Sequence, residues 1–326
     1  MTTLSVSVAL ATYNSAPYIE AQVRSILAQT LVPDEVVVAD DGSTDETIEI
    51  VRSVVSGHGS SSTRLVVLPM DGHRGVSGNF ARGISACTGD LVALSDHDDV
   101  WHQDRLAVAV RSFLDDPTLL FAHADARLVD EDGVPLGSSL LDALGVTSAD
   151  RAEVSHGHAF ETYIRRNLAT GATSMFRRSL VSSALPIPPE WVHDEWLAIV
   201  ASAVGKVRLI EQELIDYRQH ASNQIGVRRP TVRYRIGRML EPRAERYNVL
   251  SRRSELLLSR LEQVGAPDDF LALARKKARF EKTRSTYPAG RLGRVGPVLR
   301  EYLSGSYRAL SSQRNRDVIR DLLQPA

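Results

Sequence analysis

The sequence predicts an α/β fold, in which helices flank a mainly parallel β-sheet and a helical C-terminal extension follows. Three observations lead to this prediction. Short β-branched runs alternate with helical patterns in the first part of the chain, polar residues follow the ends of these runs, and the last part is helical and rich in arginine. The 326 residues, 43% of them hydrophobic, suffice for one large globular domain and an appendage.

The first elements follow the rhythm of βαβ units. We expect strands at residues 4–11, 35–40, 64–69 and 90–95. A first helix should open near Pro17, because proline is favoured at the first helical position. A second should open near Ser43, because Ser43 and Glu46 have the spacing of a capping box. A third is expected over residues 76–87 and should end at Gly89, which suits the left-handed conformation after a helix.

The pattern of the following residues is that of an α+β arrangement. We expect helices near residues 103–114, 158–166 and 194–204, strands near 119–129, 171–176 and 206–217, and a turn at Asp132-Gly133. From residue 231 onward the pattern is helical, with interruptions at 265–267 and 287–296. We therefore divide the chain into a domain over residues 1–228 and a basic helical region over residues 229–326.

The net charge of −1 hides an asymmetry along the chain. Residues 228–326 hold 23 Lys and Arg against 10 Asp and Glu, whereas the residues before them hold 16 and 30. The excess of Lys and Arg indicates either a peripheral contact with an anionic membrane surface, or packing on the acidic domain or on a second subunit, as in a homodimer. Nucleic acid is not among the expected partners.

Several classes of protein are excluded by simple features. The single cysteine, Cys87, cannot form an internal disulfide or a cysteine zinc site, and its apolar neighbourhood predicts a small core residue. The apolar runs are of strand length, well short of the roughly 20 residues that span a bilayer. The first residues lack the basic, apolar and small-residue pattern of a secretory signal, so we expect a cytoplasmic protein.

Polar residues follow the first two strands, at the edge where ligands bind in open α/β sheets. The first strand leads into Ala11, Thr12 and Tyr13, and the second ends in Asp40 and Asp41. Carboxylates directly after an apolar strand are costly unless they meet solvent, donors or cations. Each group alone could be a helix cap or a solvated turn. Together they suit a nucleoside, with Tyr13 stacked on the base and Asp40 accepting a hydrogen bond from an imide or ribose.

A denser carboxylate cluster, Asp96, Asp98 and Asp99, follows the apolar run at residues 91–94. Three carboxylates within four residues repel one another, so a compensating divalent cation is expected. In an extended segment Asp96 and Asp98 project to the same side, where they could hold a hard metal and a ribose hydroxyl together. Mn²⁺ or Mg²⁺ there could bridge a diphosphate and neutralise charge on the leaving group.

Six segments give the chain a resemblance to a known family. The segments are residues 8–14 (VALATYN), 38–45 (VADDGSTD), 96–101 (DHDDVW), 171–176 (GATSMF), 193–198 (HDEWLA) and 217–223 (YRQHASN). They resemble family 2 glycosyltransferases with the GT-A fold, and within that family the bacterial rhamnosyltransferase-like branch. Two positions differ from the branch: His97 stands where glutamine is common, and His73 stands where asparagine is common before Gly75.

The resemblance implies roles for individual residues. Ala11, Thr12, Tyr13, Asp40 and Asp41 would bind the nucleoside. Asp96 would bind the ribose or ribosyl phosphate, and Asp98 the Mn²⁺ or Mg²⁺, with Asp99 supporting. Asp194 would be the general base, with Glu195 as its nearest rival, and His220 would approach the diphosphate or the metal. From their charge alone, Arg74 and Arg82 could reach the pyrophosphate, although an arginine at such a position is usually solvated.

These inferences together predict an inverting glycosyltransferase of cell-surface polysaccharide synthesis. The donor would be dTDP-rhamnose or a UDP-sugar, and the acceptor a hydroxyl of a glycan or of a lipid-linked molecule. One alternative is a nucleotidyltransferase that makes the nucleotide sugar, which would need a Gly-rich loop with a basic residue early in the chain, and residues 11–17 offer neither. Another alternative is a non-catalytic nucleotide- or carbohydrate-binding module.

Overall fold

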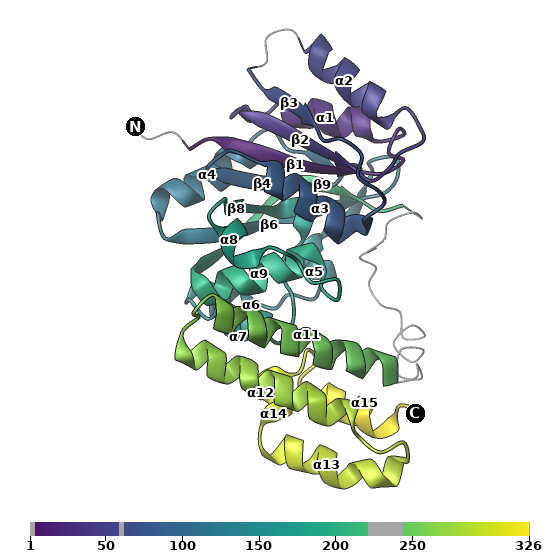
Figure 1. The fold of residues 1–326 in the computed structure, drawn as a ribbon, viewed down its shortest axis with the longest axis vertical. Coiled ribbons are helices and arrows are strands. Elements are labelled where there is room, and N and C mark those ends of the chain that lie inside the picture. The colour runs from purple at the N-terminus through teal and green to yellow at the C-terminus, as the bar shows by residue number, and fades with distance from the viewer. Residues whose placement is uncertain (1–3, 59–61, 221–243, 326) are drawn as a thin grey trace.

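The computed structural model describes residues 4–58, 62–220 and 244–325, and Figure 1 shows their arrangement. The sheet and its helices form one end of the molecule, and the C-terminal helices are stacked at the other end. The predicted boundary between residues 228 and 229 lies outside the described residues, as does the end of the last motif, 221–223. Within the described ranges, no helix is both long and apolar enough to cross a membrane.

The first four long strands form the parallel half of the sheet. Neighbouring strands run in the order β3 (Arg64–Val67), β2 (Glu35–Asp40), β1 (Val6–Thr12) and β4 (Leu91–Ser95), and all three pairs are parallel. The sheet continues from β4 through β8 (Ser174–Arg177), β6 (Leu119–Val129), β9 (Lys206–Arg218) and β5 (Val100–Trp101), with β7 (Pro135–Ser139) paired to β6. The predicted α/β class is confirmed, and the second half adds antiparallel pairs at β8, β5 and β7.

The helices of this domain are α1 (Ile19–Leu27), α2 (Thr47–Gly57), α3 (Gly75–Ala86), α4 (Arg105–Asp115), α5 (Leu140–Ala143), α6 (Ser148–Ser155), α7 (Ala159–Tyr163), α8 (Leu180–Ala184) and α9 (His193–Val204). The sequence did not predict α5, α6, α8, β5 or β7, all of which are short. A 3₁₀ turn, η1 (Gly171–Thr173), takes the first half of the strand predicted at residues 171–176. Cys87 is a buried core residue, as predicted, and Trp101 and Trp196 are buried as well.

Two predicted helix ends are wrong. The capping box of Ser43 and Glu46 does not form, because the Ser43 hydroxyl donates to Asp40 Oδ1 (2.6 Å), and α2 begins only at Thr47. Gly89 is not in the left-handed region. Glycine is needed there for a close approach instead, since a Cβ atom would lie 2.8 Å from the backbone nitrogen of Ser7.

The C-terminal region consists of α11 (Ala244–Gln263), α12 (Asp268–Ser285), α13 (Arg291–Leu303), α14 (Ser306–Leu310) and α15 (Arg316–Leu323). The break expected at residues 287–296 is shorter than predicted, because α13 begins at Arg291 despite the glycines and the proline within it. Leu257 and Leu261 of α11 belong to the same hydrophobic core as Trp196 and Leu197 of α9. The C-terminal region therefore packs on the domain that contains the sheet, and this contact is made through apolar side chains.

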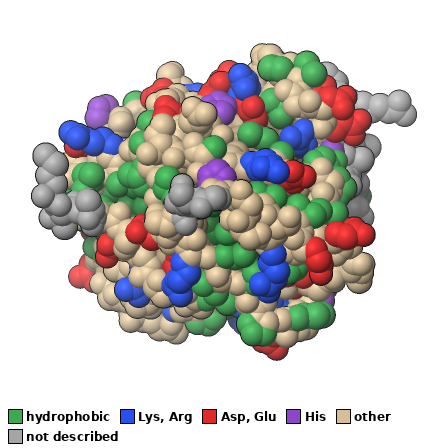
Figure 2. All heavy atoms as spheres, turned by 90° about the horizontal axis from the view of Figure 1, so that it is seen from above, with side chains coloured by type: hydrophobic (Ala, Val, Ile, Leu, Met, Phe, Trp, Pro, Cys, Tyr) green, Lys and Arg blue, Asp and Glu red, His purple; other side chains and the backbone are tan. Residues whose placement is uncertain are grey.

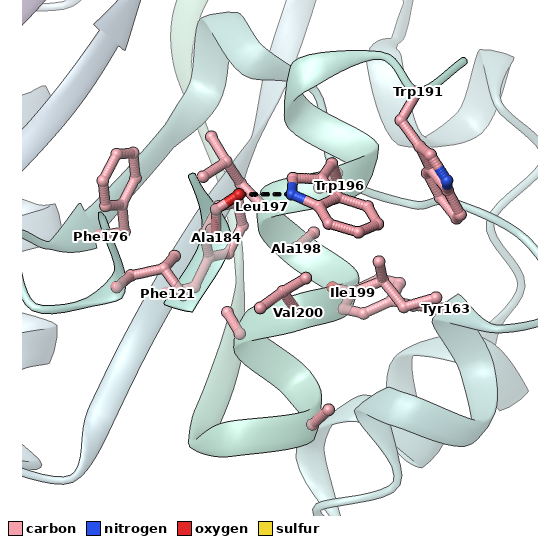
Figure 3. Packing of buried hydrophobic residues seen from close by; sticks show 14 of the residues in the cluster. Phe121, Tyr163, Phe176, Ala184, Trp191, Trp196, Leu197, Ala198, Ile199 and Val200 are labelled. Carbon is pink, nitrogen blue, oxygen red and sulfur yellow. Dashed lines mark hydrogen bonds between the residues drawn. The ribbon is translucent and has the colours of Figure 1, made fainter. Parts of the chain in front are cut away.

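Figure 3 shows the α9 side of this shared core, where Trp196 and Val200 lie among Phe121, Phe176 and Ile199. The Trp196 indole donates a hydrogen bond to the carbonyl of Ala184 (2.6 Å), so its polar atom is satisfied inside the core. The position of α9 is thus fixed on both sides, by the sheet and by α11, which in turn fixes the residues at its N-terminal end.

Candidate active site

A cavity of 1420 Å³ opens at the carboxyl ends of β1 and β4. Its lining includes predicted site residues from five parts of the chain, namely Ala11, Thr12, Tyr13, Asp41, Asp96, Asp98, Asp194 and His220. The parallel pairing of β1 with β2 and with β4 brings the first three motifs to one edge of the sheet, while Asp194 comes from α9 and His220 follows β9. Asp40 and Arg82 lie beside the lining rather than in it.

The ends of β1 and β2 are joined by side chains. The carboxylate of Asp40 accepts a hydrogen bond from the Thr12 hydroxyl (2.7 Å) and another from the Ser43 backbone N–H (2.8 Å). Arg82 on α3 donates to the carbonyls of Asp40 and Pro69, and so ties the ends of β2 and β3 together. In this arrangement Asp40 and Arg82 face protein groups, whereas Tyr13, with 45% of its surface exposed, faces the cavity.

Asp41 holds the loop that precedes α3. Its carboxylate accepts from the backbone N–H groups of Arg74 (2.6 Å) and Gly75 (2.9 Å), and it contacts His73 Nδ1 at 2.8 Å. The His73 ring lies 5.2 Å from that of Tyr13, measured between centroids. The departure at His73 therefore gives Tyr13 a ring neighbour on the cavity wall.

The carboxylate cluster lies between β4 and β9. His220 Nε2 is 2.9 Å from Asp98 Oδ2, and the Arg218 backbone N–H donates to Asp99 Oδ1 (3.1 Å). The second oxygen of Asp99 is buried and has no hydrogen-bond partner among the residues that the structure describes. Burial, reinforced by the charges of Asp98 and Asp194, raises the pKa of Asp96 to about 8. The pKa of Asp99 is also raised well above its ordinary value, first by burial and then by its acidic neighbours.

A buried arginine that the sequence analysis missed balances part of this charge. The Arg105 guanidinium lies over the ring of Trp101, 3.4 Å from its centroid, and donates to the carbonyl of Leu94 (3.0 Å). Burial lowers its pKa to about 9, while the charges of Asp99 and Asp96 act to raise it. The signal was in the sequence, because Arg105 occupies the apolar stripe of α4, where an unpaired charge would be costly.

Asp194 lies in the first turn of α9. The helix begins at His193 with Val192 as its N-cap, so Asp194 is not the capping residue. Its carboxylate accepts from the backbone N–H of Gly171 (2.9 Å) and from that of Glu195 (2.6 Å). Burial raises its pKa, and these N–H donors oppose that rise. The result is a fixed carboxylate on the cavity wall with a basicity above that of an ordinary aspartate.

Glu195 has a different environment. Its carboxylate forms an ion pair with Arg253 of α11, whose guanidinium also lies 4.0 Å from the centre of the Trp191 ring. Burial raises the pKa of Glu195, and the charge of Arg253 acts against this shift. Glu195 is thus engaged in the contact between α9 and the C-terminal region, and Asp194 is the better placed of the two as a base.

The C-terminal region also lines the cavity, which the sequence did not predict. Its contributions are Leu250, Arg253, Ser254 and Leu257 of α11, Lys277 of α12, and Ser312 and Gln313 after α14. These residues are far from the motifs along the chain, and no local pattern marks them. The cavity is thus lined by residues of the sheet domain and of the C-terminal region together.

The residues present fit a divalent cation that the protein binds through only some of its coordination positions. Asp98 and His220 offer a carboxylate and an imidazole at one point, and Asp96 lines the cavity beside them. Among the described residues, no group of three or more His, Cys, Asp or Glu side chains is arranged to hold a metal ion. The remaining ligands would therefore be water or diphosphate oxygens, as is usual for Mg²⁺ in nucleotide sites.

Replacing Gly171 by alanine tests how tightly Asp194 is positioned. A Cβ atom at Gly171 would lie 2.6 Å from Nε2 of His193, a buried ring stacked on Phe80 with 4.0 Å between centroids. The ring cannot move freely, so we expect a loss of about 1–3 kcal/mol of stability by overpacking. Because the Gly171 N–H also binds Asp194, activity should fall as well.

Gly57→Ala is the matched control, since a Cβ atom there would meet no heavy atom of the described residues within 4 Å. Unfolding by urea and turnover measured on both variants provide the comparison. If Gly171→Ala were as stable and active as Gly57→Ala, the close contact between residue 171 and His193 would not constrain the site, and this prediction would be wrong.

Comparison with known proteins gives one family and a set of distant relatives. The sequence model described as "Glycosyl transferase family 2" matches residues 7–182. An uncharacterized glycosyltransferase of Nostoc sp. is 29% identical over 227 residues, which are 68% of this chain and 66% of that protein. The Escherichia coli protein WfaP, a UDP-Glc:α-D-GlcNAc-diphosphoundecaprenol β-1,3-glucosyltransferase, is 25% identical over 67% of this chain and 78% of its own length.

A solved structure is similar over nearly the whole chain. The mannosyltransferase PcManGT from Pyrobaculum calidifontis, in complex with GDP-Man and Mn²⁺, aligns with 98% of this chain and 86% of its own, with a TM-score of 0.55 and 19% identity. At this identity the likeness concerns the fold. The GT-A-like architecture expected from the sequence is therefore confirmed.

Proposed function

Since the chain belongs to glycosyl transferase family 2, we propose that it transfers a sugar from a nucleoside diphosphate sugar to a hydroxyl of a glycan or lipid-linked acceptor, with inversion at the anomeric carbon. The observation that carries the proposal is the convergence of Asp96, Asp98 and Asp194 on one cavity. The proposed sugar transfer would be a step in cell-surface polysaccharide synthesis. The name of the relative WfaP, which describes transfer from UDP-Glc to a diphosphoundecaprenol-linked sugar, supports an acceptor of this class.

In the proposed reaction the nucleoside lies against Tyr13 and the ends of β1 and β2. The acceptor oxygen attacks the anomeric carbon, its proton passes to the carboxylate of Asp194, and the bond from that carbon to the diphosphate oxygen breaks. Asp194 is ready for this step because two backbone N–H groups orient its carboxylate. Asp98 and His220 would hold Mn²⁺ or Mg²⁺, which supplies positive charge for the departing diphosphate.

The nucleotidyltransferase alternative is disfavoured by the loop after β1. Such enzymes use free backbone N–H groups to cradle phosphates. Here the N–H of Asn14 donates to Ser43 Oγ (2.8 Å) and that of Ser15 donates to Thr47 Oγ1 (2.7 Å). The N–H of Ala16 donates to Asp45 (3.0 Å) as well. The loop is therefore used to join β1 to α2. A non-catalytic module is the remaining alternative, and measured turnover would exclude it.

A panel of nucleotide sugars tests the proposed donor. We expect one dTDP- or UDP-sugar with Mn²⁺ to raise the melting temperature by roughly 5 °C, because a ligand present at 100 times its dissociation constant adds about 2.7 kcal/mol to the folded state. dTDP-rhamnose, UDP-sugars and GDP-mannose should be compared with the free nucleotides, and hydrolysis of the active sugar should then be measured. A protein that none of these molecules stabilises would contradict the proposal.

A further inference from the structure

Helix α13 has an apolar face that the described residues leave exposed. It lies at the end of the molecule away from the sheet (Figure 1). Its inner side holds Arg294 and Val298 against the small core of α12 and α14. Leu292 and Leu303 are 90% and 75% exposed, and three further apolar residues are about half exposed, namely Val295, Leu299 and Tyr302.

The exposed apolar residues form one stripe. At 3.6 residues per turn their positions fall within about 100° of the helix circumference. The exposed Arg291 and Arg300 flank the stripe on its two sides, and Arg294 and Val298 are buried outside it. Thirteen residues make a helix about 20 Å long, so the stripe extends over several turns.

The exposed charges around this helix have one sign. In the described residues 287–325 the exposed charged side chains are Arg291, Arg300, Arg308, Arg314 and Arg316. Asp317 and Asp321 are buried, and Glu301 is partly so. The opposite end of the molecule differs, because acidic and basic side chains are interspersed over the face seen in Figure 2.

We propose that α13 docks on an anionic membrane surface, lying in the plane of the interface. Leu292, Leu299 and Leu303 would enter the boundary between headgroups and acyl chains, and Arg291 and Arg300 would contact lipid phosphates. An apolar stripe with basic flanks is the pattern of helices that bind membranes in this way. The proposal does not depend on the transfer reaction.

A second copy of the chain fits this surface less well. In a twofold contact the same patch meets itself, so Arg291 and Arg300 of each copy would approach those of the other. Such like charges repel, whereas anionic lipid attracts them. The charge of the patch therefore favours the lipid surface over self-association.

Sedimentation with lipid vesicles tests the docking surface. The full chain should pellet with vesicles of phosphatidylglycerol and phosphatidylcholine at low salt, less at high salt, and not with phosphatidylcholine alone. The double variant Leu292→Gln and Leu303→Gln should partition at least about tenfold more weakly, because both leucines lose their burial in lipid. Both sites are exposed, so the melting temperature should be unchanged.

The matched control is Leu114→Gln with Leu136→Gln, two half-exposed leucines outside the C-terminal region, and it should bind vesicles like the parent protein. Equal binding of the α13 variant and the control, or no binding by the parent protein at low salt, would overturn the proposal. Analytical ultracentrifugation without lipid provides a second reading. A dimer that the α13 variant dissociates would assign the stripe to self-association and also overturn it.

Discussion

Replacing Asp194 by asparagine is expected to lower turnover by two orders of magnitude or more, with nucleotide and metal binding unchanged. A sugar hydroxyl is a weak nucleophile at neutral pH, and a positioned base contributes about 10²–10⁴-fold in rate. Asparagine keeps the size of the side chain and an oxygen that can accept from Gly171 or Glu195, but it cannot take the proton. Single-turnover kinetics and calorimetry with the donor nucleotide measure the two effects separately.

The pH dependence of the parent enzyme gives the same residue a second test. A general base must be ionised, so activity is present above its pKa and is lost as the pH falls through it. Because burial raises the pKa of Asp194, the acidic limb of the rate profile should lie above the ordinary aspartate value of 3.8. That limb should be missing from the residual activity of Asp194→Asn.

Glu195→Gln is the control for both tests of Asp194. Glu195 is bound to Arg253, so we expect its replacement to weaken the contact between α9 and α11 and to affect turnover much less. The stability of Glu195→Gln should therefore fall while its acidic limb stays in place. Near-normal turnover of Asp194→Asn would remove Asp194 from the mechanism and make Glu195 the next residue to test.

Replacing Asp98 by alanine is expected to abolish the dependence of donor binding on a divalent cation. Asp98 and His220 are the two side chains that meet at the carboxylate cluster. Loss of a group that only supports a ligand costs 10–100-fold in metal affinity, so loss of the ligand itself should cost about 100-fold or more. Calorimetry with UDP or dTDP, in Mn²⁺ and in EDTA, should give one weak affinity for Asp98→Ala under both conditions.

Two further variants define the metal assignment. Asp115→Ala removes a half-exposed carboxylate at the end of α4 and should keep the full response to Mn²⁺. His220→Ala should reduce the response if the imidazole is a ligand and leave it unchanged if His220 only orients Asp98. Equal nucleotide affinity of the parent protein in EDTA and in Mn²⁺ would contradict the assignment of Asp98.

The sequence predicted the elements whose pattern is long and one-sided. The strands at residues 35–40 and 119–129 have the predicted bounds, because nearly every residue in them is buried. The short β7 and α8 were missed, since the five residues of each carry too little periodicity to recognise. Their existence depends on partners distant in the chain, such as β6 for β7.

The sequence predicted most of the residues that form the site, but not the directions in which their side chains point. The motifs named the carboxylates that line the cavity, but they could not show that Asp40 would bind Thr12 and Ser43. The direction of such a side chain depends on the loop around it, which local sequence does not determine. The contribution of α11 to the cavity is a contact between regions far apart in sequence, and the pattern of a single sequence contains no signal for it.

The core that α9 shares with α11 has a consequence for how the chain is made. Trp196 leaves the ribosome about 60 residues before Leu257, its partner in that core. Domains fold as units during synthesis, N-terminal parts first. Here the sheet can form early, but one side of α9 stays uncovered until α11 has emerged. The nascent chain therefore carries an exposed apolar helix for several seconds at ordinary rates of translation, which makes this interval the point at which a chaperone would have most to protect.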